Sequence, residues 1–467
     1  MQSRPNILFL LTDQQRFDAL GVVSPWVKTP NLDRLARGGT VFKESYCNSP
    51  LCMPSRQSLF SGRYPSVTGT LANGVEMPED LPHLSSFLKP YGYRTGYCGK
   101  LHFKNHSNRD HREPHPSYGF DLLVNSDEPG CYPDAYIEWV KNVSPGEVDN
   151  CRCTSPPICD FHPRIDVGPR EPSDAHVFEG PEQLTHSAFV AQHCIDFLNT
   201  HSGGPFFLTA GFYAPHAPIN PPARFLEWYS PENMPLPSQD QEFDSFIHDE
   251  NLDLEPDRWQ RNRQYYYALV SHVDDQIGRI LSALERRNLA ENTLIIFTSD
   301  HGENLGDHQR IGKGMPAWRS SSAVPLIISP PRSSGAEISF HNSFVELVDI
   351  VPTALEYAGV PVPPSVQGRS LKSLLSGEKK AFRDSVFIEQ AQNGGLWRAV
   401  RNYEWTYLYF TDGKKVWEGL YDLSSDPGES TNLANEEGHE SILSDLRGLM
   451  LRRITEAVQG TRPTGAY

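Results

Sequence analysis

The chain has 467 residues, of which 38% are hydrophobic and 21% are charged, so it can bury a large core and is not a disordered protein. Its formal net charge of -16 argues against nucleic-acid binding, because a phosphate-binding surface needs clustered Lys and Arg. A small anionic substrate remains compatible with this charge, because a local basic pocket can lie within an acidic protein.

The N-terminal apolar run, Asn6–Thr12, is short and leads directly into polar residues. It lacks the small-residue cleavage site of a signal peptide, so we expect a buried first strand there. As numbered, the protein is expected in the cytoplasm, or in the periplasm or outside the cell if a leader is removed. No apolar run reaches the roughly 20 residues of a membrane span, so no membrane-spanning helix is expected.

Apolar runs alternate with helical patterns along most of the chain. The runs that are typical of buried parallel strands are Asn6–Thr12, Pro205–Phe212, Thr293–Ser299 and Val324–Ser329. The clearest helical patterns are Pro30–Arg37, Gln183–Asn199, Arg263–Arg287 and Ser343–Ala358. This alternation predicts an α/β fold with a large, mixed but mostly parallel sheet sandwiched by helices.

Two regions depart from the alternation. Residues 106–180 are rich in Pro, Asp, His and Cys, and such a long irregular region is often a lid or a pocket wall, so we expect it to set specificity. From residue 383 the pattern changes to short strands and a final helix, namely Ser385–Gln390, Leu396–Arg401, Trp405–Phe410, Val416–Leu423 and Gly438–Val458. We therefore predict a catalytic domain over 1–382 and, over 383–467, a smaller antiparallel sheet with a closing helix.

The eight cysteines are too sparse for a disulfide scaffold. Cys151, Cys153 and Cys159 lie close together in the irregular region, but their spacing matches no usual zinc pattern. Reduced loop thiols are the preferred interpretation, and a zinc site is the alternative.

Polar residues follow three of the expected strands. Asp13 and Gln14 follow the first, His216 the second, and Asp300 and His301 the third. Ligands bind beyond the carboxyl ends of parallel strands, so these side chains should meet at one sheet edge. The oxygens suit calcium or magnesium, and the imidazole nitrogen also allows manganese. Each residue alone could be a cap or turn residue, but the joint arrangement favours a metal site.

The run Cys52-Met53-Pro54-Ser55-Arg56 opens another helical pattern. Pro54 suits a first helical turn, which would place Cys52 near a helix N-terminus that favours an anion. Arg56, one turn on, could bind negative charge with two parallel donors. The run thus predicts an activated thiolate beside a cation, although a lone Cys is more often a buried structural thiol.

This run resembles the C-x-P-S-R signature of the type I sulfatases, in the alkaline phosphatase superfamily. Further segments resemble motifs of that family in the same order, namely Asn6–Gln14, Ser61–Pro65, Gly99–Phe103, Tyr213–Pro218, Ser299–Glu303 and Leu420–Leu433. The resemblance implies an alkaline phosphatase-like fold and hydrolysis of a sulfate ester. It also implies that a maturase oxidises Cys52 to formylglycine, whose hydrate is the nucleophile.

The same resemblance implies a ligand set for one divalent cation, most often calcium, consisting of Asp13, Gln14, the modified Cys52, Asp300 and His301. Gln14 and His301 replace the commoner Asp and Asn, as in choline sulfatases and phosphonate monoester hydrolases. Mg²⁺ and Mn²⁺ therefore stay open as alternatives.

Roles for the remaining residues also follow from the resemblance. Asp300 would accept the proton of the attacking hydroxyl, His216 with Lys313 would protonate the leaving oxygen, and His102 would help to expel sulfate. Charge on the sulfuryl oxygens would be stabilised by the metal and by three cations, Arg56, Lys100 and Lys313. Read alone, Lys100 would be a surface lysine and His102 a strand-end histidine, and only the surrounding motifs favour the functional interpretation.

Four further residues are weaker candidates. Asn73 is either a substrate contact or a turn residue. His272 and His308 are interpreted as structural, and Asp307 as a support for the site at best.

The nearest alternative function is a phosphonate monoester hydrolase or phosphodiesterase with the same nucleophile and metal. Lys100 and His102 favour a sulfate monoester, because the diesterases considered lack both. A non-catalytic homologue should have lost the nucleophile or the metal ligands, and neither is lost here.

The substrate is expected to be a sulfated carbohydrate or a small organic sulfate. Choline-O-sulfate would need an aromatic cage, for which the candidates are Tyr118, Phe120, Tyr132, Tyr136 and Trp139. The chain lacks a recognisable choline-sulfatase tail, which counts against that substrate. Polar candidates for holding a sulfated sugar are Asp110, His111, Arg112 and His115. A homo-oligomer stays open.

Overall fold

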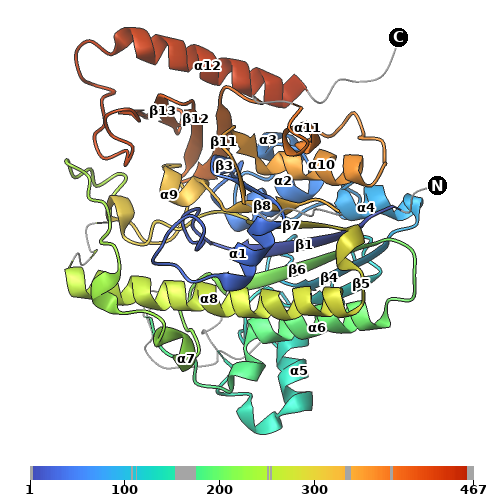
Figure 1. Ribbon diagram of the computed structural model, residues 1–467. Coiled ribbons are helices and arrows are strands. Elements are labelled where there is room, and N and C mark those ends of the chain that lie inside the picture. Colours follow the sequence, from blue (N-terminus) through green and yellow to red (C-terminus); the bar gives the residue numbers. More distant parts are fainter. Residues whose placement is uncertain are drawn as a thin grey trace, which may run out of the picture.

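The computed structural model describes residues 4–106, 109–111, 113–152, 175–249, 252, 255–331, 338–378 and 382–459. Within these ranges an eight-stranded sheet has the order β5-β4-β6-β1-β7-β8-β2-β9 (Figure 1). Its strands are β1 Asn6–Asp13, β2 Thr40–Phe42, β4 Arg94–Gly99, β5 Leu122–Asn125, β6 Phe206–Pro215, β7 Thr293–Ser299, β8 Leu326–Ser329 and β9 Ser339–His341. No helix in the described ranges is long and apolar enough to cross a membrane.

Strand β1 lies in the middle of the sheet, parallel to β6 on one side and to β7 on the other. Its side chains alternate between two cores, because successive residues of a strand point to opposite faces. Leu8 and Leu10 belong to one core, whereas Ile7, Phe9 and Leu11 belong to the other. Both faces of β1 are therefore buried, which explains its unbroken apolar sequence.

Helices cover both faces of the sheet, as predicted (Figure 1). One core includes residues of α1 Pro30–Arg37, α5 Ala135–Val143, α6 His186–Thr200, α7 Ala223–Leu226 and α8 Pro256–Arg286. The opposite core includes residues of α2 Cys52–Ser61, α4 Leu84–Leu88, α10 Ile350–Tyr357 and α11 Lys372–Leu375. Two short helices, α3 Pro65–Thr68 and α9 Arg319–Ser322, lie between these elements and the C-terminal sheet.

The C-terminal region forms a separate four-stranded antiparallel sheet in the order β11-β12-β13-β14. Its strands are Val386–Gln392, Gly395–Arg401, Trp405–Thr411 and Val416–Asp422, and the helix α12, Glu440–Gln459, lies across them (Figure 1). Phe387, Val400 and Tyr407 of the sheet share a core with Leu446 and Met450 of α12. The predicted fold class is confirmed for both sheets, while the boundary at residue 382 stays a prediction.

Two predicted elements were wrong in part. Strand β8 is antiparallel to β7, because the segment between them stays at the carboxyl edge of the sheet and the chain returns from there. The helix expected over Ser343–Ala358 starts later, because Val345–Glu346 forms a short strand, β10, beside β3, Ser45–Tyr46. The irregular region also contains β5 and α5, which the sequence pattern did not reveal.

Candidate active site

Cys52 is the first residue of α2, and it follows Leu51 in extended conformation. Its Sγ lies 2.8 Å from Nζ of Lys313, 3.2 Å from Nε2 of His301 and 3.9 Å from Nζ of Lys100. Burial and Asp13 both raise the pKa of the Cys52 thiol, but Lys100, Lys313 and His301 outweigh them, so that the pKa lies below its usual value. Cys52 thus lies at a helix N-terminus beside cations, while its role as the nucleophile stays a prediction.

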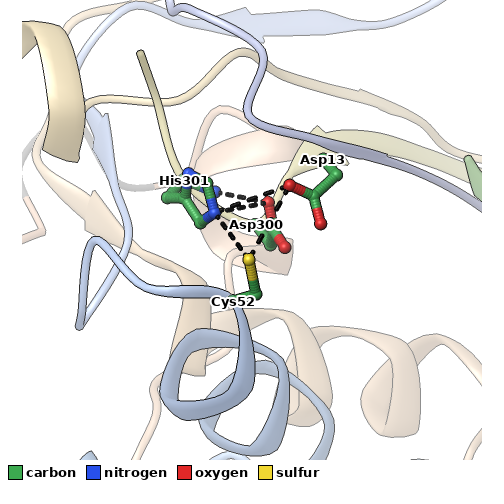
Figure 2. A group of neighbouring side chains, drawn as sticks. All are labelled: Asp13, Cys52, Asp300 and His301. Atoms are coloured by element: carbon green, nitrogen blue, oxygen red, sulfur yellow. Dashed lines mark hydrogen bonds and ion pairs between the residues drawn. The ribbon is translucent and has the colours of Figure 1, made fainter. Parts of the chain in front are cut away.

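Four side chains converge at the carboxyl edge of the sheet (Figure 2), with one ligand atom from each lying within 4.8 Å of the others: Asp13, Cys52, Asp300 and His301. Nε2 of His301 lies 3.6 Å from Oδ1 of Asp13 and 3.6 Å from Oδ1 of Asp300. Nδ1 of His301 donates to the carbonyl oxygen of Gly302, so Nε2 is directed at the cluster. Burial lowers the pKa of His301, but Asp300 and Cys52 raise it, and the net shift is upward.

The residues fit a divalent cation. Two carboxylates face each other at close range, and the side-chain oxygen of Gln14 is buried without a hydrogen-bond partner in the described part of the chain. Gln14 lies beside the carboxylates, since its backbone N–H donates to Oδ1 of Asp300 at 3.2 Å. Oxygen donors with one imidazole nitrogen suit calcium, magnesium or manganese.

Arg56 is fully buried behind the two carboxylates. Its Nε lies 2.7 Å from Oδ2 of Asp300, and its Nη2 lies 3.1 Å from Oδ2 of Asp13. Nη1 donates to the carbonyl oxygen of Lys100 at 2.6 Å and to the hydroxyl of Tyr97 at 3.3 Å. The sequence predicted that Arg56 binds the transferred group itself, whereas its observed contacts hold the two acidic ligands in place.

The two lysines approach the thiol at different depths. Lys100 is buried and lies 2.7 Å from Oδ2 of Asp13, so it is not the solvated surface lysine that its residue type alone would suggest. Burial lowers the pKa of Lys100, but Asp13 and Cys52 raise it well above its usual value. The Lys313 side chain is 16% exposed, against 2% for Lys100. Together with Asp13, Cys52, Arg56, Asp300 and His301, these lysines form what we call the catalytic cluster.

The two predicted acid–base histidines both have a lowered pKa in this environment. Burial, followed by Lys100, lowers the pKa of His102 well below its usual value. Burial, followed by Lys313, does the same to the pKa of His216, whose Nδ1 donates to the carbonyl oxygen of Ala217 at 2.7 Å. The negative charge of Asp13 raises the pKa of His216 and so opposes this lowering.

Asn73 and the residues interpreted as structural have clear partners. Oδ1 of Asn73 accepts the backbone N–H of Met53 at 3.0 Å, so this side chain caps the first turn of α2. Asp307 pairs with Arg16 and Arg263, away from the thiol. His272 contacts Thr185, and Nδ1 of His308 lies 2.7 Å from Asp240. These contacts agree with the structural interpretation.

The five aromatic residues considered for a cage do not lie together. Tyr118 and Phe120 belong to the core on one face of the sheet, whereas Tyr136 belongs to the core on the opposite face, with Trp139 packed against it. Tyr132 stacks instead on His111 at 3.8 Å. Residues on opposite faces of a sheet cannot surround one ammonium group.

The irregular region does supply polar groups near the site. His111 and His115 line a cavity of about 370 Å³ with Asp127, and Oδ1 of Asp127 accepts the backbone N–H of His102 at 2.8 Å. Asp110 immediately precedes His111, which lines this cavity, and Arg112 lies outside the described residues. Of the cysteine cluster only Cys151, which is buried, is described, and Cys153 and Cys159 lie outside the described residues.

Sequence reasoning missed Glu303, which is 3% exposed and contacts both Gln14 and the segment before Lys313. A signal was present, because Glu303 is an acidic residue two positions beyond His301 in a segment already identified as a metal motif.

Comparisons with known proteins agree with this geometry. Residues 5–360 match the family described as Sulfatase, and residues 306–456 match the C-terminal family of N-sulphoglucosamine sulphohydrolase. The arylsulfatase of Clostridium perfringens is 29% identical, over 98% of this chain and 96% of its own. The choline-sulfatase of Rhizobium meliloti is 30% identical, over 92% of this chain and 82% of its own.

Among solved structures, the phosphonate monoester hydrolase of Agrobacterium radiobacter has a TM-score of 0.80 and 26% identity, with coverage of 97% of this chain and 96% of that one. This likeness confirms the alkaline phosphatase-like fold. The family match spans most of the chain, and the protein therefore belongs to the sulfatase family, as a hydrolase of sulfuric esters.

Proposed function

We propose that the protein hydrolyses a sulfate monoester to an alcohol and inorganic sulfate, with a formylglycine made from Cys52 and one bound divalent cation. The observation that carries the proposal is the position of Cys52, at the start of α2 and within 4.8 Å of Asp13, Asp300 and His301. The hydrate of formylglycine supplies a hydroxyl nucleophile at this position, provided that a maturase has oxidised the thiol. Such an enzyme is the first partner that the proposal requires.

The cation would be held by Asp13, Gln14, Asp300 and His301, together with residue 52. Bound there, it would polarise the anionic ester and lower the pKa of the attacking hydroxyl. Calcium is the preferred ion, because most of the donors are hard oxygens, and Mg²⁺ or Mn²⁺ is the alternative.

The chain's own residues provide the remaining chemistry. Lys313 and Lys100 place two positive charges near position 52, from which attack would begin. Positive groups fixed before the reaction stabilise charge that develops on the sulfuryl oxygens. Arg56 acts through Asp13 and Asp300, because its donors are already engaged with them.

Proton movement is assigned to three residues. Asp300 accepts the proton of the attacking hydroxyl, and His216 with Lys313 delivers one to the leaving oxygen. Burial and Lys313 lower the pKa of His216, so in this proposal the Lys313 ammonium group is the source of that proton and His216 passes it to the leaving oxygen. His102 assists release of sulfate.

The substrate class follows from the surroundings of the thiol. A sulfated carbohydrate is favoured over choline-O-sulfate, because the aromatic candidates for an ammonium cage lie on opposite faces of the sheet. The cavity lined by His111, His115 and Asp127 offers donors and acceptors for hydroxyl groups. Asn73 caps α2 and supports the nucleophile's position, and a direct contact of Asn73 with substrate is the weaker proposal.

A second candidate function is hydrolysis of phosphonate monoesters or phosphodiesters, which the likeness to the phosphonate monoester hydrolase favours. Lys100 and His102 argue for sulfate, since an extra cation and an extra proton-transfer group suit a monoester in a one-metal site. The matured protein should have a larger kcat/KM on an aryl sulfate than on the matching aryl phosphodiester. A larger value on the diester would reverse the two proposals.

The nucleophile itself is tested by mass spectrometry of the peptide that contains Cys52, isolated from the native host. We expect the mass loss that accompanies replacement of CH2SH by CHO. The variant Cys52→Ala should lose at least about 10³-fold in kcat, by analogy with removal of other nucleophiles. Cys194→Ser, which alters another fully buried thiol, is the matched control and should keep its activity. An unmodified thiol in active native protein would contradict the proposal.

A panel of sulfated saccharides, aryl sulfates and choline sulfate, with free sulfate as the readout, then identifies the substrate.

A further inference from the structure

Glu303 is a buried carboxylate whose two oxygens have different partners. Oε1 accepts two backbone N–H groups, from Leu305 at 2.7 Å and from Gly312 at 2.6 Å. Oε2 accepts the side-chain amide of Gln14. The three bonds join the first strand of the sheet to the segment that leads into Lys313.

These contacts determine which way the Gln14 amide points. A carboxylate can only accept hydrogen bonds, and in an amide only the nitrogen can donate, so Nε2 must face Glu303. The oxygen Oε1 therefore faces the other way, where it is buried and has no partner among the described residues. Gln14 is anchored there, because its backbone N–H donates to Asp300 and its φ of 65° lies in the left-handed region.

We propose that Glu303 is a positioning residue for the metal site, which fixes the amide of Gln14 so that its oxygen, and not its nitrogen, faces the cation. The inference rests on the proposed function, because it assumes that a cation binds at the catalytic cluster. Outer partners of metal ligands commonly set the orientation of those ligands in this way.

Glu303 also links the metal ligand to a substrate-facing cation. Gly312, whose N–H it accepts, directly precedes Lys313, and Nζ of Lys313 lies 2.8 Å from Sγ of Cys52. One carboxylate thus fixes both the orientation of Gln14 and the backbone from which Lys313 extends.

The substitution Glu303→Gln distinguishes the positioning role from general packing, because it keeps the shape of the side chain and replaces one carboxylate oxygen by NH2. In Glu303→Gln, the new carbonyl oxygen can keep both backbone bonds only if the new NH2 group faces Gln14. Two NH2 groups cannot bond to each other, so Gln14 must turn its oxygen toward residue 303 and its nitrogen toward the cation. The opposite choice would leave the backbone N–H groups of Leu305 and Gly312 without their acceptor, which is the costlier outcome.

The test is a calorimetric titration of the metal-free, matured protein, with Ca²⁺ alone and with Mn²⁺ alone, which measures the affinity for each ion. Glu303→Gln should weaken binding about 10–100-fold, the usual cost of losing an outer partner of a metal ligand. The double variant Gln14→Glu/Glu303→Gln should restore binding to within a few-fold of wild type, because the amide at 303 can donate to a carboxylate at 14 whose other oxygen faces the cation. Glu389→Gln is the matched control, as Glu389 is also buried and accepts a backbone N–H, from Ser66 at 2.8 Å.

The metal-free proteins supply a second readout that does not depend on Glu303→Gln being well folded. Gln14→Glu alone places two carboxylates together and should lower the melting temperature, whereas the double variant should regain most of the loss. Binding by Glu303→Gln as tight as wild type, or failure of the double variant to improve on it, would overturn the inference and leave the proposed function intact. Failure of the wild-type protein to bind either ion, and to bind Mg²⁺ in the same titration, would overturn both.

Discussion

The catalytic cluster and a second buried group of charges are built from the same kinds of side chain. The second group, which we call the anchor cluster, lies where α12 meets the catalytic region and consists of Tyr64, Glu346, Asp349, Arg383 and Arg453. Its charges balance, with two carboxylates and two guanidinium groups. Oε1 of Glu346 accepts from Arg453 at 2.6 Å and from the backbone N–H of Phe387 at 2.8 Å. Oε2 accepts from the hydroxyl of Tyr64 and lies 3.4 Å from Arg383, so both oxygens are engaged.

The catalytic cluster differs in that its partners do not balance. Three fixed cations, Arg56, Lys100 and Lys313, surround two carboxylates and a thiol with a lowered pKa. The oxygen of Gln14 next to them is buried without a partner in the described chain. Buried charge alone therefore does not identify a functional site, because the anchor cluster has it too. What distinguishes the catalytic cluster is the unpartnered oxygen of Gln14, which fits the proposed cation, and the excess of lysine and arginine over carboxylates, which fits the proposed anionic substrate.

The largest expected difference between the clusters concerns activity. Arg56→Met removes the group that holds Asp13 and Asp300 together, so both metal ligands lose their fixed orientation. We expect kcat/KM for the preferred sulfate ester to fall on the order of 10³-fold, a cost comparable to loss of a main electrostatic contact. Arg56→Lys should recover little, because an ammonium group cannot bridge two carboxylates as a guanidinium does. Near-wild-type activity in Arg56→Met would place Arg56 with the structural residues.

The matching change in the anchor cluster should affect stability instead. Arg453→Met leaves Glu346 with Arg383 alone and removes the bonds to Ser385. The free energy of unfolding should fall by about 3–5 kcal/mol, as for other buried pairs that lose one partner. The kcat/KM of the protein that remains folded should not change. Arg452→Met, which alters an arginine with a 53% exposed side chain, is the control and should cost no more than about 1 kcal/mol. A loss of turnover in folded Arg453→Met would show that the two clusters are coupled.

The comparison of the two clusters also explains how much of the fold could be predicted from the sequence. Strands β1, β6 and β7 were predictable because both of their faces are buried and their sequences are continuously apolar. Strand β4 was not, because its segment, Arg94–Gly99, contains two glycines and an arginine and derives its burial from neighbours on both sides. The start of α10 was predicted too early, because Val345 and Glu346 pair with β3 and Glu346 also binds Phe387, all of which are distant in the sequence.

The same limit applies to the site. The side chains that converge in the catalytic cluster, Asp13, Cys52, Asp300 and His301, could be selected from the sequence because each belongs to a short motif. The orientation of Arg56 could not, since it depends on where Asp13 and Asp300 lie in space, more than 40 and more than 240 positions away. Glu303 was missed for a related reason, because its partner Gln14 is 289 positions distant.

The smallest expected effect is the pH dependence of the anchor cluster. Burial raises the pKa of Glu346, but Arg383 and Arg453 outweigh it and lower the pKa from 4.5 to about 2. A carboxyl with a lowered pKa in the folded state stabilises the protein above its unfolded pKa, and this contribution is lost as the pH falls toward the folded value. Because Arg453 attracts only the ionised form of Glu346, the stability difference between wild type and Arg453→Met should be largest above pH 4.5 and should shrink below it, by on the order of 1 kcal/mol.

Denaturant unfolding of both proteins between about pH 7 and about pH 3 measures this difference. Acid effects at other carboxyl groups are shared by the two proteins and cancel. Asp349 is included in that cancellation, because its pKa is raised by burial and its guanidinium partner is Arg383, which both proteins keep. A difference that stays constant with pH would mean that Arg453 stabilises the fold through its bonds to Ser385 and Tyr64, and that the charge of Glu346 contributes little.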